Sequence, residues 1–434
     1  MRHYIFIFIN LIALCVLSFF TTNYTSPYKA NEKINELEKF IKTIESISPK
    51  DTSFEDLEFL KETLKNTDII MLGEQTHSDG ATFLAKSRLI KYLHQELGFD
   101  ALIYEAGLYD TENLWKSLKS NVNNNPEEFV KALYTFWCTN QENEVLLKYL
   151  LEHINTDNEI EIAGLDVQFS GRIKHQVRDS LLSQYLITKP EINEKKFPSF
   201  FSIKDKYSSY AYKWRAKQLS VTKRDSILND IHIINNLYYS DSLLNKEDSL
   251  YSRFFRNLET LYCYSWNYER GEDIRFHIRD SAMAENFIWL KENKYKNRKV
   301  IIWAANLHIS YDNNSYSPRL ADFMSMGEYI KKKYGKQCYS INFTSFSDVS
   351  NISDSEKIYN NKSVEYLLHQ LNSPFLYFDF NEIDSTSFLR KEFVMNCNQR
   401  LSLNAKWSKI TDGIFYIDKM TGLTKLKETY GNNN

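Results

Sequence analysis

Short apolar runs alternate along this chain with longer stretches in which apolar residues recur every three or four positions. Each run is bounded by polar residues or glycine, as is typical of buried strands. The seven runs are 69–73, 99–105, 159–166, 299–303, 338–344, 375–380 and 414–418. Helical spacing fills 80–97 and 111–155 between them. Because strand–helix–strand successions indicate parallel strands, we predict an α/β fold with a mostly parallel sheet and flanking helices.

The strand signals fade between residues 181 and 296, where charged and aromatic helical patterns take over. The helices expected there cover Tyr207–Leu219, Ile227–Tyr239, Leu250–Asn267 and 279–293. We interpret 181–296 as a helical insertion, and its Tyr238, Tyr239 and Tyr264 are candidates for lining a cleft. The α/β core then comprises 25–180, which opens with a packing helix over 28–66, and 297–425. Residues 426–434 are expected to form a disordered tail.

The amino terminus has the pattern of a targeting segment. Arg2 and His3 precede a run over residues 5–20 that is apolar apart from Asn10 and Ser18. This run is shorter than the roughly 20 residues that a membrane-spanning helix needs. We therefore interpret residues 1–24 as a signal peptide or an N-terminal anchor. Either reading predicts a protein outside the cytoplasm, periplasmic or membrane-anchored through residues 5–20.

Composition narrows the function classes. Apolar residues make up 43% of the chain, and Lys plus Arg (54) nearly balance Asp plus Glu (56). A nucleic-acid-binding protein usually carries a basic surplus, so we expect no nucleic-acid partner. Export permits disulfides, and isolated buried thiols are the other interpretation of Cys138, Cys263, Cys338 and Cys397. The pattern does not indicate an oligomeric state.

Polar groups follow four of the predicted strands at the point where each strand ends. They are Glu74 and His77 after the first strand, Glu105 after the second, Asp166 after the third, and Asn306 and His308 after the fourth. The carboxyl ends of parallel strands meet at one edge of a sheet, so these groups can converge. One polar strand end is an ordinary loop, but four in one chain favour an active site.

The chemistry of these groups fits hydrolysis. A histidine titrates near neutral pH and can take a proton from water, while a neighbouring carboxylate orients its ring. We expect no cofactor, although a divalent metal held by His77, His308 and a glutamate is an alternative. An inactive relative that binds a ligand in the cleft is a third interpretation. The chain has neither a Gly-rich phosphate loop nor the Gly-x-Ser-x-Gly motif of many serine hydrolases.

The stretch Leu72-Gly-Glu-Gln-Thr-His77 resembles the Gly-Glu-x-Thr-His motif of the erythromycin esterase family. The motifs that follow at similar spacing are Glu105-Ala-Gly107, Gly164-Leu-Asp-Val-Gln168, Met283-Ala-Glu-Asn286, Trp303-Ala-Ala-Asn-Leu-His308, Ser325-Met-Gly327 and Asp412-Gly-Ile414. The resemblance spans about residues 65–420. It implies an α/β core with a helical insertion. It also implies hydrolysis of a macrolide lactone by water, which a general-base histidine activates without a covalent enzyme intermediate.

By this resemblance His77 corresponds to the general base, Glu74 and Glu105 to the carboxylates around it, and His308 to a distal histidine. Trp137, Asp166, Gln168 and Asn306 are candidate substrate-binding residues. Lys86 stands where the family usually has an arginine, and its flexible ammonium is expected to reach into the site. Ala305 stands where macrolide esterases carry the first histidine of a His-Asn-x-His motif. We therefore expect weak or no hydrolysis of 14-membered macrolides and a different small-molecule ester or lactone as substrate.

Overall fold

The computed structural model describes residues 27–121, 125–239, 246–266, 272–315, 323–349, 357–358, 362–398 and 400–426. The targeting segment predicted for residues 1–24 lies outside the described residues, as does the predicted tail after residue 426.

The described residues form a mostly parallel sheet of nine strands, ordered β1-β8-β11-β6-β2-β5-β3-β4 with β7 beside β6. The parallel strands are β2 (Ile69–Leu72), β3 (Phe99–Gly107), β4 (Glu161–Asp166), β5 (Lys299–Trp303), β6 (Cys338–Val349) and β11 (Gly413–Thr421). The antiparallel pairings are made by β1 (Lys42–Thr43), β7 (Lys357–Ile358) and β8 (Phe375–Asp379). The predicted fold class is confirmed, and all seven predicted strands are present.

The central strands are apolar throughout because both faces of the sheet are covered. Ile70 and Leu72 of β2 pack into the cluster on one face, and Ile69 and Met71 pack into the cluster on the other. Successive side chains of a strand point to opposite faces, so an unbroken apolar run is what a doubly covered strand requires. The unbroken run is therefore the feature that places β2 in the interior.

Helices cover each face with their apolar stripes. The cluster on one face includes residues of α4 (Gly80–Leu97), α5 (Leu108–Ser120), α6 (Thr135–Cys138) and α7 (Gln141–Glu152). The cluster on the other includes residues of α14 (Glu272–Trp289), α15 (Asn306–Ile309) and α16 (Met326–Tyr334). Helix α4 ends at Gly98, which adopts a left-handed conformation with φ of 70°. Residues without a Cβ reach this conformation without strain, so the glycine stops the helix where the sequence predicted.

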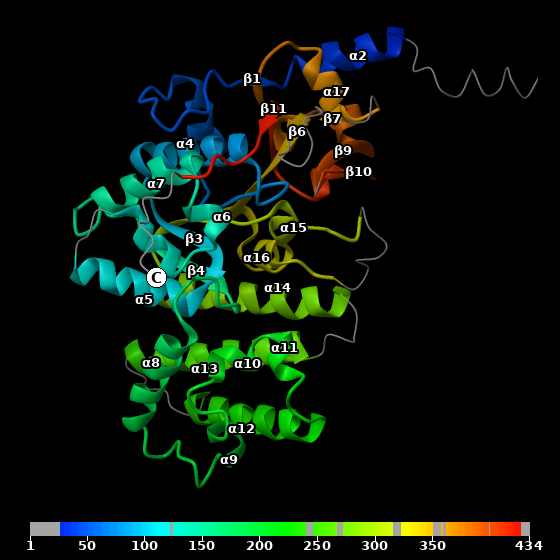
Figure 1. Cartoon of the computed structure of the whole chain (residues 1–434). Helices are drawn as coiled ribbons and strands as arrows, with labels where there is room; N and C mark the ends of the chain where they lie inside the picture. Colours follow the sequence, from blue (N-terminus) through cyan, green and yellow to red (C-terminus); the bar gives the residue numbers. More distant parts are fainter. Residues whose placement is uncertain are drawn as a thin grey trace, which may run out of the picture.

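A group of helices follows β4 and has its own apolar core. It comprises α8 (His175–Ile187), α9 (Pro198–Phe201), α10 (Tyr207–Tyr210), α11 (Lys213–Ala216), α12 (Val221–Tyr239) and α13 (Lys246–Trp266). Figure 1 shows these helices gathered below α14, which separates them from the sheet. Tyr238 is buried in this core and its hydroxyl contacts that of Tyr185, so it lines no cleft. Nothing is described of the Tyr239 side chain.

Two local predictions were wrong, and one hairpin was not predicted. The first helix, α2 (Pro27–Leu37), ends early, and the next residues pair as β1 with β8 before the short α3 (Phe59–Thr63). Pro49 cannot donate a backbone hydrogen bond, which disfavours a helix across this stretch. Residues 207–219 form two short helices rather than one. A hairpin of β9 (Phe393–Asn398) and β10 (Leu401–Ala405) was not predicted. It lies near α17 (Val364–His369) in Figure 1.

Cys138, Cys263, Cys338 and Cys397 form no disulfide, so of the two interpretations the structure favours separate thiols. Within the described ranges, no helix is long and apolar enough to span a bilayer.

Candidate active site

The carboxyl ends of four neighbouring strands surround a cavity of about 600 Å³. Strands β2, β5, β3 and β4 lie side by side in that order, so the loops that follow them meet at one edge of the sheet. The cavity is lined by Gln75, Thr76, His77, Glu105, Tyr134, Phe136, Trp137, Gln168, Tyr264, Phe276, Arg279, Ala305, Leu307 and His308. The sheet order therefore brings together the two histidines that the sequence singled out.

Glu74 is a fully buried carboxylate directly behind the cavity. Its Oε1 lies 2.7 Å from His77 Nδ1, and its Oε2 accepts a hydrogen bond from Lys86 Nζ at 2.9 Å. The indole nitrogens of Trp137 and Trp303 donate to the same two oxygens at 3.2 and 2.7 Å. Burial alone would raise the pKa of Glu74, but Lys86 and His77 outweigh it and hold this pKa below its usual value. Glu74 is thus an anion with four donors.

His77 presents the opposite edge of its ring to the cavity. An ionised Glu74 can only accept, so Nδ1 of His77 carries the proton between them and Nε2 keeps its lone pair. The ring stacks on Phe136 with centroids 4.6 Å apart and meets Trp137 edge-on at 5.7 Å. Its side chain is 40% exposed. Burial opposes protonation, but Glu74 raises the pKa of His77 above its usual value. The geometry gives a fixed base that faces the cavity.

Arg279 of α14 joins the carboxylates that end β3 and β4. Its Nη2 donates to Glu105 Oε1 at 2.7 Å and to Asp166 Oδ2 at 2.6 Å, and its Nε donates to Asp166 Oδ1 at 3.1 Å. The second oxygen of Glu105 accepts from the backbone N–H of Ala305 at 3.0 Å. Burial would raise the pKa of Glu105, but His308 and Arg279 hold it well below its usual value. This network fixes Glu105 as an anion on the cavity wall.

His308 is the second histidine of the cavity, and three ionisable groups hold it. Its Nδ1 lies 2.8 Å from Asp280, and its Nε2 lies 3.3 Å from Glu105 and 3.2 Å from Arg279 Nη1. Burial would lower the pKa of His308, but Asp280 and Glu105 outweigh it and raise the pKa. An ionised Asp280 accepts from the Nδ1–H of His308, and Nε2 accepts a hydrogen bond from Arg279 Nη1, since a guanidinium can only donate. Nη1 of Arg279 carries a second N–H, which can donate to another acceptor.

Comparison with known proteins identifies the family. Residues 94–419 match the sequence model of the erythromycin esterase family, which is well over half of the chain. The chain belongs to the erythromycin esterase family.

Several known proteins are similar to this chain in sequence or in fold. The chain is 26% identical over 359 residues to a Bacillus subtilis (strain 168) protein named "Putative hydrolase YbfO", covering 76% of this chain and 77% of that one. A crystal structure described as a succinoglycan biosynthesis protein superposes with a TM-score of 0.74 at 16% identity, covering 92% of this chain and 100% of the other. A crystal structure of a variant of the erythromycin esterase EreC in its open conformation superposes with a TM-score of 0.67 at 14% identity. The match covers 88% of this chain and 98% of the other. At such low identity these two structures show the shared fold alone.

Several residues proposed from the sequence do not face the cavity of this erythromycin esterase family member. Lys86 is fully buried behind Glu74, with its ammonium 4.0 Å from the centre of the Trp303 ring, so the expected reach into the site is wrong. Asp166 is the buried partner of Arg279. Neither Lys86 nor Asp166 lines the cavity, so each can act on a substrate only through the residue that it contacts. Gln168 and Trp137 do line the cavity, as expected of substrate-binding residues.

Asn306 holds two loops together instead of facing a substrate. Its backbone N–H donates to the Glu74 carbonyl at 2.9 Å, and its Nδ2 donates to the carbonyls of Phe343 and Cys397 at 2.9 and 2.5 Å. A Cβ on Gly73 would lie 1.9 Å from Asn306 Oδ1, so this approach requires glycine. The substrate-binding role predicted for Asn306 does not fit this position.

The sequence reasoning missed Arg279, Asp280 and most of the aromatic wall. A signal for the charged pair exists in α14, where Arg279 and Asp280 lie four and three residues before Met283. Met283 and Phe287 are buried against the sheet, so the pair continues a buried stripe. Charged residues on a buried stripe are rare unless they are paired, and are candidates for a site. Tyr264, proposed as a cleft residue, does line the cavity.

The metal alternative has no ready-made set of ligands among the residues that the structure describes. There, no group of three or more His, Cys, Asp or Glu side chains is arranged to hold a metal ion together. His77 and His308 instead contact separate carboxylates, Glu74 and Asp280.

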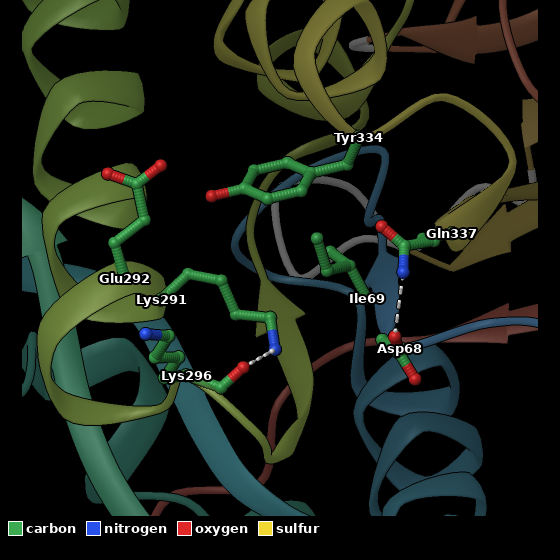
Figure 2. Close-up of a pocket in the computed structure, with 7 residues that line it drawn as sticks. All are labelled: Asp68, Ile69, Lys291, Glu292, Lys296, Tyr334 and Gln337. Carbon is green, nitrogen blue, oxygen red and sulfur yellow. Dashed lines mark hydrogen bonds between the residues drawn. The ribbon is translucent and has the colours of Figure 1, made fainter.

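A second hollow, of about 440 Å³, lies at the amino end of β2, at the opposite edge of the sheet. Figure 2 shows its lining, in which Lys291 points toward the backbone carbonyl of Lys296 and Asp68 contacts Gln337. Lys291 Nζ donates to the carbonyls of Tyr295 and Arg298 at 3.1 and 2.7 Å. These bonds hold a turn together, so the histidine cavity is the better candidate for chemistry.

Proposed function

We propose that this protein is a hydrolase that cleaves a carboxylic ester or lactone, with His77 as the general base that activates water. The observation that carries the proposal is the bond between His77 Nδ1 and Glu74, which directs the unprotonated Nε2 toward the cavity. A base fixed in this way can take a proton from a water molecule as the water attacks a carbonyl carbon.

The proton then has a defined path. His77 becomes an imidazolium when it accepts the proton from water, and the buried Glu74 anion stabilises that charge. The imidazolium returns the proton to the leaving alkoxide when the carbon–oxygen bond breaks. Two products result, a carboxylic acid and an alcohol, which remain one molecule when the substrate is a lactone.

Arg279 is the group proposed to stabilise the negative charge that develops on the carbonyl oxygen. Its Nε and Nη2 are held by Asp166 and Glu105, which fixes the guanidinium plane, while Nη1 donates one N–H to His308 and has a second N–H to offer beside the cavity. Donors fixed before the reaction lower the barrier because they need no reorganisation during it. His308, held by Asp280, helps to position Arg279 Nη1.

Direct attack by water is favoured over a covalent intermediate. No serine or cysteine is among the described residues that line the cavity, and the hydroxyl of Thr76 donates to Asp79 at 2.7 Å. A serine or threonine nucleophile would need a base within hydrogen-bond reach of its hydroxyl. One ring nitrogen of His77 contacts Glu74, and the other faces the open cavity.

The cavity walls favour a substrate with an apolar body. Tyr134, Phe136, Trp137, Tyr264 and Phe276 supply aromatic surface beside the charged groups. Ala305 leaves a methyl group where the resemblance implies a histidine in macrolide esterases. We therefore propose that the substrate is a small-molecule ester or lactone other than a macrolide. We also propose that the enzyme is exported and hydrolyses this substrate outside the cytoplasm.

The test is a panel of carboxylic esters and lactones, with product analysis and intact-mass spectrometry during turnover. We expect hydrolysis of at least one member with no acyl-enzyme adduct. An adduct that accumulates would contradict direct water attack. Stoichiometric bound metal, together with activity lost on chelation, would favour the metal-dependent alternative. Ligand binding, followed through Trp137 fluorescence, without hydrolysis of any member would favour an inactive relative.

A further inference from the structure

The β9–β10 hairpin contacts both loops that carry the catalytic histidines. The carbonyl of Asn396 accepts a hydrogen bond from Gln75 Nε2, and the carbonyl of Cys397 accepts one from Asn306 Nδ2. Arg400, next to the turn of the hairpin, donates through Nη2 to Asp79. One element that is remote in sequence thus reaches the His77 loop through Gln75 and Asp79 and the His308 loop through Asn306.

Asp79 connects Arg400 of the hairpin to the turn that carries His77. Its carboxylate accepts from the Thr76 backbone N–H at 2.9 Å and from the Thr76 hydroxyl at 2.7 Å. These two bonds close the four-residue turn in which His77 lies. Asp79 is fully buried, and burial raises its pKa although Arg400 opposes the shift. A buried carboxylate needs a cation or several donors to stay ionised, and Arg400 supplies the cation.

The hairpin is itself firmly held, so it can serve as a support. The backbone N–H of Asn396 donates to the buried Glu365 of α17 at 2.8 Å, and its Nδ2 donates to the same carboxylate at 3.2 Å. Ser402 on the opposite strand donates to Asn396 Oδ1 at 2.7 Å. Arg400 adopts φ of 56°, a conformation that residues other than glycine rarely take. This unusual backbone conformation occurs at the residue whose guanidinium contacts Asp79.

We propose that Arg400 is a positioning residue, which sets the orientation of the His77 imidazole through Asp79 and the Thr76–Asp79 turn. The proposal rests on the proposed function, because it names the part of the chain that holds the base. Arg400 does not itself line the cavity. Its loss therefore changes the geometry of the base and leaves the substrate-binding walls in place.

The first experiment measures kcat and KM of the full chain with the Arg400→Met substitution on an ester that the wild-type protein cleaves. We expect kcat to fall roughly ten- to hundredfold, since small errors in the position of a catalytic group carry penalties of this size. KM should stay nearly unchanged because the aromatic walls are intact. Arg400→Lys keeps the charge without the planar fork and should retain more activity.

The second experiment needs no substrate. Diethylpyrocarbonate acylates the unprotonated imidazole nitrogen, and peptide mass spectrometry gives the rate at His77 alone. In Arg400→Met, assayed well below its Tm, we expect this rate to change severalfold. Arg390→Met is the matched control, since Arg390 donates to the Ile383 carbonyl at 3.1 Å and touches neither loop. It should leave kcat and the His77 rate unchanged.

Each outcome decides the proposal. A folded Arg400→Met protein with wild-type kcat, or with the wild-type modification rate at His77, would overturn it. If Arg400→Met does not fold, Arg400→Lys takes its place, and wild-type values for both readouts in that variant would overturn the proposal. If the wild-type protein hydrolyses no ester, the proposed function fails, and the modification rate alone then decides whether Arg400 positions His77.

Discussion

The carboxylate of Glu74 joins a half-exposed imidazole to a buried ammonium, with His77 Nδ1 2.7 Å from one oxygen and Lys86 Nζ 2.9 Å from the other. The charge of Glu74 is thus needed by two partners at once. Burial lowers the pKa of Lys86 to about 8, although Glu74 opposes the shift. The base therefore depends on a cation that titrates within the working range of an enzyme.

Glu74→Gln should affect activity and stability together. The amide cannot stabilise the imidazolium, so we expect kcat to fall by about 10²–10⁴, the range for a general-base system. Lys86 is left without its anion in the interior, which typically costs about 3–5 kcal/mol. Steady-state kinetics and urea unfolding at pH 7 measure the two effects. A variant with wild-type turnover would show that His77 does not need this carboxylate.

The alkaline limb of the pH–activity profile should depend on Lys86. Above pH 8 the lysine loses its proton, and its neutral amine no longer makes the charge-assisted hydrogen bond that holds the Glu74 carboxylate, and through it the His77 ring, in place. We expect kcat to fall as pH rises through this range, and Lys86→Arg to move the fall to higher pH because arginine stays charged. Profiles from pH 6 to 10 test this. Lys91→Arg, a half-buried lysine of the same helix that donates to the Pro49 carbonyl, should change nothing.

Ala305→His should raise hydrolysis of 14-membered macrolides. Ala305 lines the cavity, so an imidazole placed there enters the space beside His308. A polar group that helps hold the attacking water or the oxyanion is worth on the order of 3 kcal/mol, or about a hundredfold in rate. Leu307→His, which also adds an imidazole to the cavity wall, is the control and should give no comparable gain. Efficient cleavage of erythromycin by the wild-type protein would refute this interpretation of Ala305.

The parts of the fold that the sequence predicted are those that a local pattern determines. Unbroken apolar runs predicted the parallel strands, and Gly98 predicted the end of α4. The β9–β10 hairpin was missed because its turn lacks the Asn-Gly or Asp-Gly pair that usually indicates one, and Arg400 takes the left-handed conformation instead. β1 was missed because a strand of two residues carries no periodicity of its own and exists through pairing with β8.

The candidate site was predicted where side chains follow strands directly. Glu74, His77, Glu105 and His308 could be brought together from the rule for parallel sheets. Asp280 and Arg279 could not, because they come from α14, and no local rule places that helix beside the cavity. Lys86 and Asn306 were given the wrong position for a related reason, since the sequence shows their chemistry but not the direction in which each side chain points from its helix.

Export remains a prediction from residues 1–24. Because a basic start and an apolar run direct secretion, we expect the protein outside the cytoplasm of its native host, either processed or still membrane-attached. Cell fractionation, with amino-terminal sequencing of the recovered protein, distinguishes the two forms. Recovery of the full-length chain in the soluble cytoplasmic fraction would rule out both.

The central claim is that His77 is the base. The most direct measurement is the rate at which His77→Ala hydrolyses the ester or lactone that the wild-type protein cleaves best. His232→Ala serves as the control, since His232 is 59% exposed and lies in α12, away from the cavity. We expect a loss of about 10²–10⁴-fold for His77→Ala with an unchanged Tm, because His77 lies in a loop outside the core. The control should keep wild-type turnover. Near-normal turnover in folded His77→Ala would contradict the account and require another residue to be the base.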